Sequence, residues 1–244
     1  MHRFYADEQN STEQSFSLTP EDTFHALKVL RIHSGETAEV IFRGTRYLSR
    51  FEPISGSSLK IQPVNILPST EPMLSVTLFQ GIPKSDKMDW IVQKAVELGA
   101  VRIVPVIFSR CIVHLDEKDC LKKQERWQKI AREAGKQSGR CVIPEVLSPV
   151  SFKDLNNFFQ ACEHVAVPWE ECTGGGPLSF FNRYPSLSSL GIVIGPEGGI
   201  SADEMHELSI LGGEPVTLGK RILRTETAGL AALSVFYGLY GEME

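Results

Sequence analysis

The chain has 244 residues, of which 42% are hydrophobic and 23% are charged, and its formal net charge is −5. These values are ordinary for a soluble globular protein, and the length is enough for one large domain or two smaller ones. The acidic average argues against a generic nucleic-acid-binding protein.

No apolar run approaches the length of a membrane span, and the first residues lack the apolar stretch of a signal peptide. We therefore expect a cytoplasmic protein without a membrane segment. The five cysteines form no Cys-x-x-Cys pair, so reduced thiols are expected rather than a structural zinc site or a disulfide framework.

The first 65 or so residues have the pattern of a small β-rich domain. A short helix is predicted at residues 20–30. Alternating polar and apolar residues, separated by turns at Arg43-Gly44 and Ser55-Gly56-Ser57, predict strands at 36–42, 47–51 and 59–61. Short strands of this kind are typical of a small barrel. The stretch 63–72 is rich in proline and polar residues and is interpreted as a linker between domains.

From residue 73 onward, strands alternate with helices, which predicts a mostly parallel sheet covered on both faces. The predicted strands lie at 73–80, 101–108, 165–167, 190–194 and 216–218. The predicted helices lie at 85–98, 121–137, 201–211 and 225–240. Gly99 is expected to end the first of these helices, and Ser201-Ala202-Asp203-Glu204 has the pattern of a capping box.

Positive charge is concentrated in one segment. Residues 102–140 carry ten Lys and Arg against five Asp and Glu, whereas residues 141–244 carry five basic and thirteen acidic residues. The first segment is a candidate phosphate-facing surface. Taken alone, however, this charge pattern is better explained by a solvated amphipathic helix whose lysines provide solubility.

The sharpest feature is LGIVIGPEGGIS at residues 190–201, an apolar strand that leads directly into a glycine-rich turn and a capped helix. Ligands of open α/β sheets bind at the carboxyl ends of strands, where glycines let the backbone approach closely. The turn is neither a dinucleotide fingerprint nor a Walker A loop. A merely tight strand-to-helix turn remains an open alternative for this motif alone.

A second strand, loop and helix start is VTLGKRILRTETA at residues 216–228. Its stretch 218–223 mixes apolar side chains with free backbone, which suits a flat base held between aliphatic groups. Lys220 and Arg221 fit a solvated loop. Arg224 stands at a helix start, where a cation is unfavourable beside the helix dipole, and a residue that breaks a local rule is a candidate functional residue.

Together, the two motifs resemble those of the SPOUT superfamily of RNA methyltransferases and, more narrowly, the RsmE family of 16S ribosomal RNA uridine N3-methyltransferases. Three other segments resemble the same family: HALKVLR at 25–31, the lysine-rich helix that ends in Glu97-Leu98-Gly99, and QSGR at 137–140. The resemblance spans nearly the whole chain in the right order. The sequence differs from the family at Lys136, where an acidic residue is expected, and at Pro168-Trp169-Glu170, where a His-Glu pair is common.

The resemblance implies a fold and a cofactor. The expected fold is an α/β SPOUT domain at 73–244 with a C-terminal trefoil knot, preceded by a PUA-like β-barrel at 1–70. S-adenosyl-L-methionine would bind in the knot, cradled by three loops: Pro168-Trp169-Glu170, the turn at 195–199 and the loop at 218–223. The protein would act as a homodimer on the small ribosomal subunit without a metal. The residues implied in cofactor binding are Pro168, Ile194, Gly195, Pro196, Gly198, Gly199, Leu218, Gly219, Ile222, Leu223, Arg224, Thr227 and Ala228.

For catalysis, a nearby cation would stabilise the uridine anion that develops as N3 loses its proton. Arg224 and Arg140 are the candidates for this role. Glu226 could act as a base, although orienting Arg224 through a charge-assisted bond fits better. His25 and His114 are further possible bases, but a surface or structural role is favoured for a lone histidine.

Several cations are expected to meet phosphates of the RNA, which provides affinity without sequence information. They are Arg3, Lys28, Arg31, Lys84, Lys87, Arg110 and Arg140, together with the helix at 122–140.

Three other functions stay open at this stage. The same fold and donor could methylate a ribose 2′-hydroxyl or another base. The chain could instead be a non-catalytic RNA-binding assembly factor without affinity for the donor. A different nucleotide-binding α/β enzyme fits least, because motifs for phosphate binding and metal ligation are missing.

Overall fold

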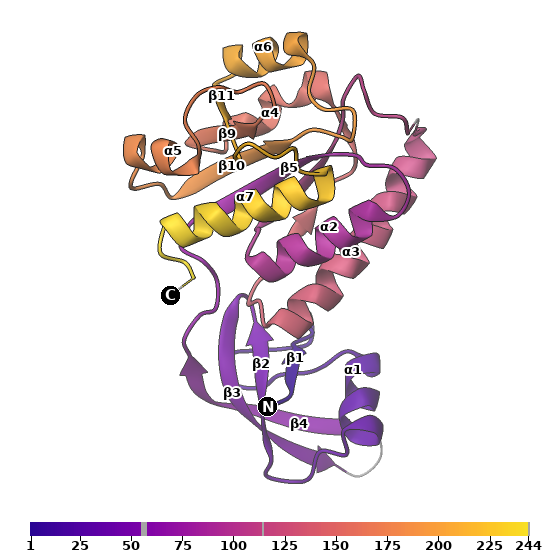
Figure 1. Cartoon of the computed structure of the whole chain (residues 1–244). Coiled ribbons are helices and arrows are strands. Elements are labelled where there is room, and N and C mark those ends of the chain that lie inside the picture. Colours follow the sequence, from indigo (N-terminus) through magenta and orange to yellow (C-terminus); the bar gives the residue numbers. More distant parts are fainter. Residues whose placement is uncertain (55–57, 114, 244) are drawn as a thin grey trace. The chain divides into compact units, whose positions relative to one another are not determined.

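The chain divides into two units in the computed structural model, which describes residues 1–54, 58–113 and 115–243. The first unit contains Met1–Glu71 and Gly135–Val142, and the second contains Pro72–Ala134 and Ile143–Glu244. The predicted turn Ser55-Gly56-Ser57 lies outside the described residues. Figure 1 shows the elements of each unit along the chain.

The first unit is built on one four-stranded sheet in the order β1-β2-β3-β4. Its strands are β1 (Arg3–Tyr5), β2 (Thr37–Phe42), β3 (Thr45–Ile54) and β4 (Ser58–Leu67). β1 runs parallel to β2, and the other neighbours are antiparallel. Phe4, Phe16 and Phe51 are buried in its core, and Phe16 also forms an isolated bridge with Ile61.

The predicted helix at 20–30 is confirmed, but it has two parts. α1 (Pro20–Phe24) continues into a π-helical turn, His25–Val29. Thr19 caps α1, because its hydroxyl accepts a hydrogen bond from the backbone N–H of Asp22.

The interpretation of residues 63–72 as a linker is wrong for its first half, since β4 extends to Leu67. β4 lies at the edge of the sheet, where a proline need not donate to a neighbouring strand. Pro63 also pairs with Ser49 where the register between β3 and β4 shifts. An edge position and an irregular register together allow a proline-containing strand.

The second unit contains a seven-stranded sheet in which every pair is parallel, as predicted. The order is β11-β9-β10-β5-β6-β7, and β8 also pairs with β6. The strands are β5 (Ser75–Gly81), β6 (Arg102–Ile107), β7 (Glu145–Val146), β8 (Val150–Ser151), β9 (His164–Pro168), β10 (Ser189–Ile194) and β11 (Gly213–Val216). β11 therefore ends where the strand predicted at 216–218 begins, because the chain leaves the sheet after Val216.

Helices cover both faces of this sheet, which confirms that prediction. They are α2 (Lys87–Leu98), α3 (Glu117–Ser138), α4 (Asn156–Phe159), α5 (Pro177–Arg183), α6 (Ala202–Ile210) and α7 (Thr225–Leu239), with a short 3-10 turn at Phe152–Asp154. Leu78 faces a core formed with α2, α5 and α7, whereas its neighbour Phe79 faces a core formed with α4 and α6. Figure 1 shows α2 and α7 side by side.

Two predicted helix ends are confirmed in detail. Gly99 follows α2 with φ of 113°, a left-handed conformation that glycine adopts without strain. Ser201 and Glu204 form a complete capping box at the start of α6. The Glu204 carboxylate also accepts a 2.7 Å hydrogen bond from the backbone N–H of Ser109, so it ties α6 to the end of β6.

Glu204 should make the stability of the second unit depend on pH. Burial raises the pKa of this carboxyl, but hydrogen bonds from Ser109 and Ser201 outweigh burial and hold it below its ordinary value of 4.5. A lowered carboxyl pKa contributes stability above pH 4.5, and this contribution is lost as the pH falls through the folded-state pKa.

Glu204→Gln should therefore lower the free energy of unfolding by about 1–2 kcal/mol near pH 7 and flatten its decline below pH 4.5. Urea unfolding between pH 3.5 and pH 7, roughly the range over which carboxylates titrate, measures both effects. Glu207→Gln, at an exposed position of the same helix, is the matched control. Identical pH profiles for Glu204→Gln and the wild type would contradict the prediction.

Candidate functional site

The loops that follow β9, β10 and β11 meet at one edge of the sheet. These strands are adjacent in the sheet and parallel, so their carboxyl ends lie on the same side. Two adjoining hollows lie among the loops and share part of their lining: Pro168, Glu170, Ile222, Leu223 and Ala228. The two sequence motifs thus come together around one site.

The turn after β10 depends on the absence of side chains. Gly199 has φ of 72°, and a Cβ atom at this residue would collide with the carboxylate of Glu170. At the end of β5, a Cβ on Gly81 would lie 2.5 Å from the nitrogen of Pro196. Glycines here allow backbone and a carboxylate to approach closely.

The loop after β11 provides aliphatic side chains and free backbone. Gly219 has φ of 102°, and its backbone N–H donates a 3.2 Å hydrogen bond to the hydroxyl of Thr217. Ile222 lines both hollows although it is 88% exposed. A flat apolar group could lie against this loop and bond its edge to main-chain atoms.

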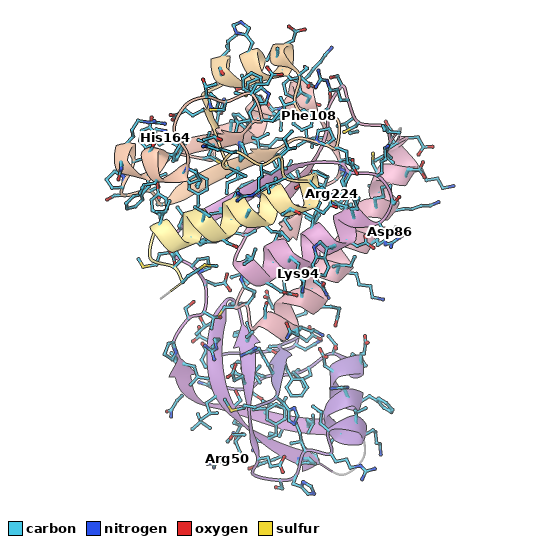
Figure 2. All side chains as sticks on the ribbon, viewed as in Figure 1. Arg50, Asp86, Lys94, Phe108, His164 and Arg224 are labelled. Carbon is cyan, nitrogen blue, oxygen red and sulfur yellow. The ribbon has the colours of Figure 1, made fainter. Side chains whose placement is uncertain are left out.

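Arg224 stands at the N-cap of α7 and lines the second hollow. Figure 2 labels it beside the start of this helix. Its side chain is exposed, and among the described residues its guanidinium has no hydrogen bond or ion pair. The predicted orienting bond from Glu226 is therefore not present, because Glu226 contacts Lys87 instead.

Lys87 bridges two carboxylates at the edge of the second hollow. Its Nζ lies 3.0 Å from Oε1 of Glu197 and 3.4 Å from Oε2 of Glu226. The hydrogen bond that it donates to Glu197 raises the pKa of Lys87 above its ordinary value. Burial raises the pKa of Glu197, yet the bonds from Lys87 and from backbone N–H groups bring it below its ordinary value. The pKa shifts of Lys87 and Glu197 both favour the charged forms that make this ion pair.

Most of the residues implied in cofactor binding line the two hollows. The exceptions are Gly198 and Thr227. Gly198 packs against Arg110, which donates a 3.0 Å hydrogen bond to its carbonyl, and Thr227 is exposed on α7.

Other residues that line the hollows were not assigned individually to the cofactor: Trp169, Glu170, Glu197, Ile200, Thr217 and Thr225, with Lys220 and Arg221 interpreted as solvated. The segment 168–170 was identified as a loop, but only its proline was selected. Glu170 carried a usable signal, since it is a carboxylate directly after a strand whose carboxyl end faces the site.

The predicted RNA-binding cations fall into three groups. Lys84, Lys87 and Arg110 surround the glycine turn, because the backbone N–H of Lys84 donates to Glu197 and Arg110 packs on Gly198. Lys28 and Arg31 are exposed in the first unit.

Arg3 and Arg140 form the third group, whose side chains are engaged within the first unit. Arg3 lies 2.7 Å from Glu39. Arg140 is only 4% exposed, and its guanidinium donates several hydrogen bonds to Glu71, the shortest of 2.7 Å. Glu71 also accepts hydrogen bonds from the backbone of Cys141 and Val142. This geometry is that of a structural ion pair.

The two histidines considered as possible bases are not placed at the site by the structure. His25 is exposed on the π-helical turn of the first unit, and His114 lies outside the described residues.

Within the described ranges, no three His, Cys, Asp or Glu side chains could hold a metal ion together. None of the helices in the described part of the chain is long and apolar enough to cross a membrane.

Comparisons with known proteins identify the family of the chain. Residues 70–237 match a family model described as an RNA methyltransferase domain, which defines the class of the chain. Ribosomal RNA small subunit methyltransferase E of Bacillus subtilis (strain 168) is 37% identical over 245 residues, covering 96% of this chain and 95% of the relative. The crystal structure of that enzyme from Neisseria gonorrhoeae, bound to S-adenosyl methionine, has a TM-score of 0.81 at 34% identity and covers 98% of each chain. The chain belongs to the ribosomal RNA small subunit methyltransferase E family, which confirms the resemblance found in the sequence.

Arg140→Ala should act on stability. It leaves the largely buried Glu71 without its cation, and breaking such a pair costs about 3 kcal/mol. Urea unfolding measures the loss. The control is Arg102→Ala, whose pair with Glu145 is exposed and contributes less than about 1 kcal/mol. Full stability of Arg140→Ala combined with loss of activity would restore Arg140 as a catalytic candidate.

Proposed function

We propose that the chain is an S-adenosylmethionine-dependent methyltransferase that methylates N3 of a specific uridine in 16S ribosomal RNA. The observation that carries this proposal is the hollow at the carboxyl ends of β9, β10 and β11, in a chain of this family. It combines a glycine cradle, an aliphatic loop and a carboxylate, the chemistry that an adenosine with an amino-acid tail requires.

The residues present fit the methyl donor. The loop at 218–223 would hold the adenine between aliphatic side chains, with its edge on main-chain groups. The Glu170 carboxylate, which faces both hollows, would accept hydrogen bonds from ribose hydroxyls. The turn at 195–199 leaves space for the rest of the molecule, because side chains are absent from Gly195 and Gly199.

The donor supplies an electrophilic methyl group on a sulfonium, so the chain needs no covalent nucleophile. Its residues align the acceptor base, and such positioning can lower a barrier by about 7–11 kcal/mol. Arg224, whose guanidinium is unpaired among the described residues, would stabilise the developing uridine anion. Lys87 is a second cation at this hollow, and Glu226 beside it is the candidate to receive the N3 proton.

The finer features of the fold are part of this proposal. Residues 73–244 would form a SPOUT domain with a C-terminal trefoil knot, and residues 1–70 a PUA-like barrel that binds RNA. The mainly antiparallel sheet of the first unit and the meeting of the loops after β9, β10 and β11 support these assignments.

The proposed assembly is a cytoplasmic homodimer that acts on the small ribosomal subunit. Apolar side chains at the rim of the site and on α7 support a protein partner, since Ile222 and Val235 are exposed. The cations around the glycine turn, Lys84, Lys87 and Arg110, would meet phosphates of the RNA.

The proposal predicts donor-dependent methylation of 30S subunits taken from a strain that lacks this enzyme. Nuclease digestion followed by mass spectrometry should locate a single methyl group on the base of one uridine. A methyl group on ribose alone would contradict the N3 assignment. Absence of binding to S-adenosylhomocysteine at millimolar concentration, with no methylation, would favour a non-catalytic assembly factor.

In the same assay, Arg224→Ala should lower the rate by about a hundredfold or more, as expected for the loss of a group that stabilises transition-state charge. Affinity for S-adenosylhomocysteine should change much less. Arg183→Ala is the control, because Arg183 pairs with Glu214 beside the amino ends of the strands.

Gly199→Ala should weaken cofactor binding by at least about tenfold, since its Cβ would displace the Glu170 carboxylate from the hollow. Gly212→Ala is a matched control. Gly212 also has a positive φ, of 95°, but no atom lies within 4 Å of its added Cβ. Both variants should lose about 1 kcal/mol of stability through backbone strain. Equal cofactor affinities of the two variants, measured by calorimetry, would contradict the role of Glu170.

A further inference from the structure

A buried chain of hydrogen bonds runs behind the proposed cofactor site. Gln80, at the end of β5, is fully buried, and its amide nitrogen donates a 2.8 Å hydrogen bond to the hydroxyl of Thr225. That hydroxyl donates a 2.7 Å hydrogen bond to the carbonyl of Gly195. The same Gln80 nitrogen donates to the carbonyl of Gly81, at 3.0 Å. We call these three bonds the Gln80–Thr225 relay.

The relay joins the three elements that must keep a fixed geometry around the site. Gly195 begins the glycine turn after β10. Thr225 is the first residue of α7 and directly follows Arg224. Gln80 pairs with Ile194 across β5 and β10, so it sits on the rigid sheet. The turn and the start of α7 are therefore held to one another and to the sheet.

The Gln80 side chain has little freedom to move. Its carbonyl oxygen faces α7, where a Cβ added to Gly229 would lie 3.1 Å from it. This oxygen is buried and has no hydrogen-bond partner among the described residues. A buried acceptor without a partner is destabilising, so an apolar side chain of the same size would suit the core better. A residue that is poor for stability, yet holds a functional turn, indicates a role in function.

We propose that Gln80 and Thr225 are positioning residues, which set the Gly195 carbonyl and the start of α7 so that the cofactor turn and Arg224 face the same hollow. This inference rests on the proposed cofactor site. Gln80 lines neither hollow, whereas Thr225 lines the second hollow and donates its hydroxyl to the Gly195 carbonyl. Together the two residues would determine the shape of the hollow's wall. Removing the relay should disturb cofactor affinity and turnover more than folding.

The test uses Gln80→Met, which keeps the volume of the side chain, and Thr225→Val, which removes only the hydroxyl. Thr225→Ser is the conservative rescue. Thr77→Val is the matched control, because Thr77 is a buried threonine on β5 that lines neither hollow. For each protein, the dissociation constant for S-adenosylhomocysteine, the kcat and KM for 30S methylation, and the urea midpoint are measured.

Gln80→Met and Thr225→Val should weaken S-adenosylhomocysteine binding by about tenfold, or 1.4 kcal/mol, and lower kcat with little change in the KM for 30S subunits. Gln80→Met should unfold at the same or a higher urea concentration than the wild type. Thr225→Ser should recover affinity to within about threefold of the wild type, and Thr77→Val should leave binding unchanged.

The inference is overturned if Gln80→Met lowers the urea midpoint while the dissociation constant and kcat stay at wild-type values. It is equally overturned if Thr225→Val and Thr77→Val have the same dissociation constant for S-adenosylhomocysteine and the same kcat. This comparison can be made even if Gln80→Met does not fold. A wild-type protein that binds no S-adenosylhomocysteine would instead refute the proposed function. The two failures are therefore distinguishable.

Discussion

Parallel neighbouring strands end at the same edge of a sheet, and the whole site depends on this constraint. β9, β10 and β11 follow one another along the chain, but in the sheet β9 lies between β11 and β10. Their three loops are consequently brought together, although helices α5 and α6 separate them in sequence. No single loop forms the hollow. A carboxylate from the first, glycines from the second and aliphatic groups from the third share its lining.

The local parts of this arrangement could be predicted because they depend on neighbouring residues. Glycine in a left-handed conformation ends α2 at Gly99, and Ser201 with Glu204 caps α6, each as the sequence indicates. The alternation of strands and helices is also visible along the sequence, and it predicts the parallel sheet. The family resemblance relates the glycine turn to the loop at 218–223, and in the structure residues of both segments line one hollow.

What could not be predicted depends on partners far away in the sequence. Arg140 was a candidate for catalysis until the structure paired it with Glu71, 69 residues earlier. Nothing near either residue indicates that pairing, since an ion pair leaves no periodic pattern. Pro63 was interpreted as part of a linker because a proline usually interrupts a strand. The edge position of β4 and the register shift beside Pro63 remove that objection, and neither is visible in the sequence. The sequence places Glu170 directly after a strand, but it does not show that the carboxylate lies against Gly199 of another loop.

The site contains two residues that are poor for stability alone. Arg224 places a cation at the positive end of a helix, and Gln80 buries an oxygen without a partner among the described residues. Elsewhere in the second unit, caps and a two-sided apolar core provide the stability that these residues remove. Locally unfavourable residues that converge on one edge of a well-packed sheet are better explained by ligand binding than by folding, because folding alone would favour replacing each of them.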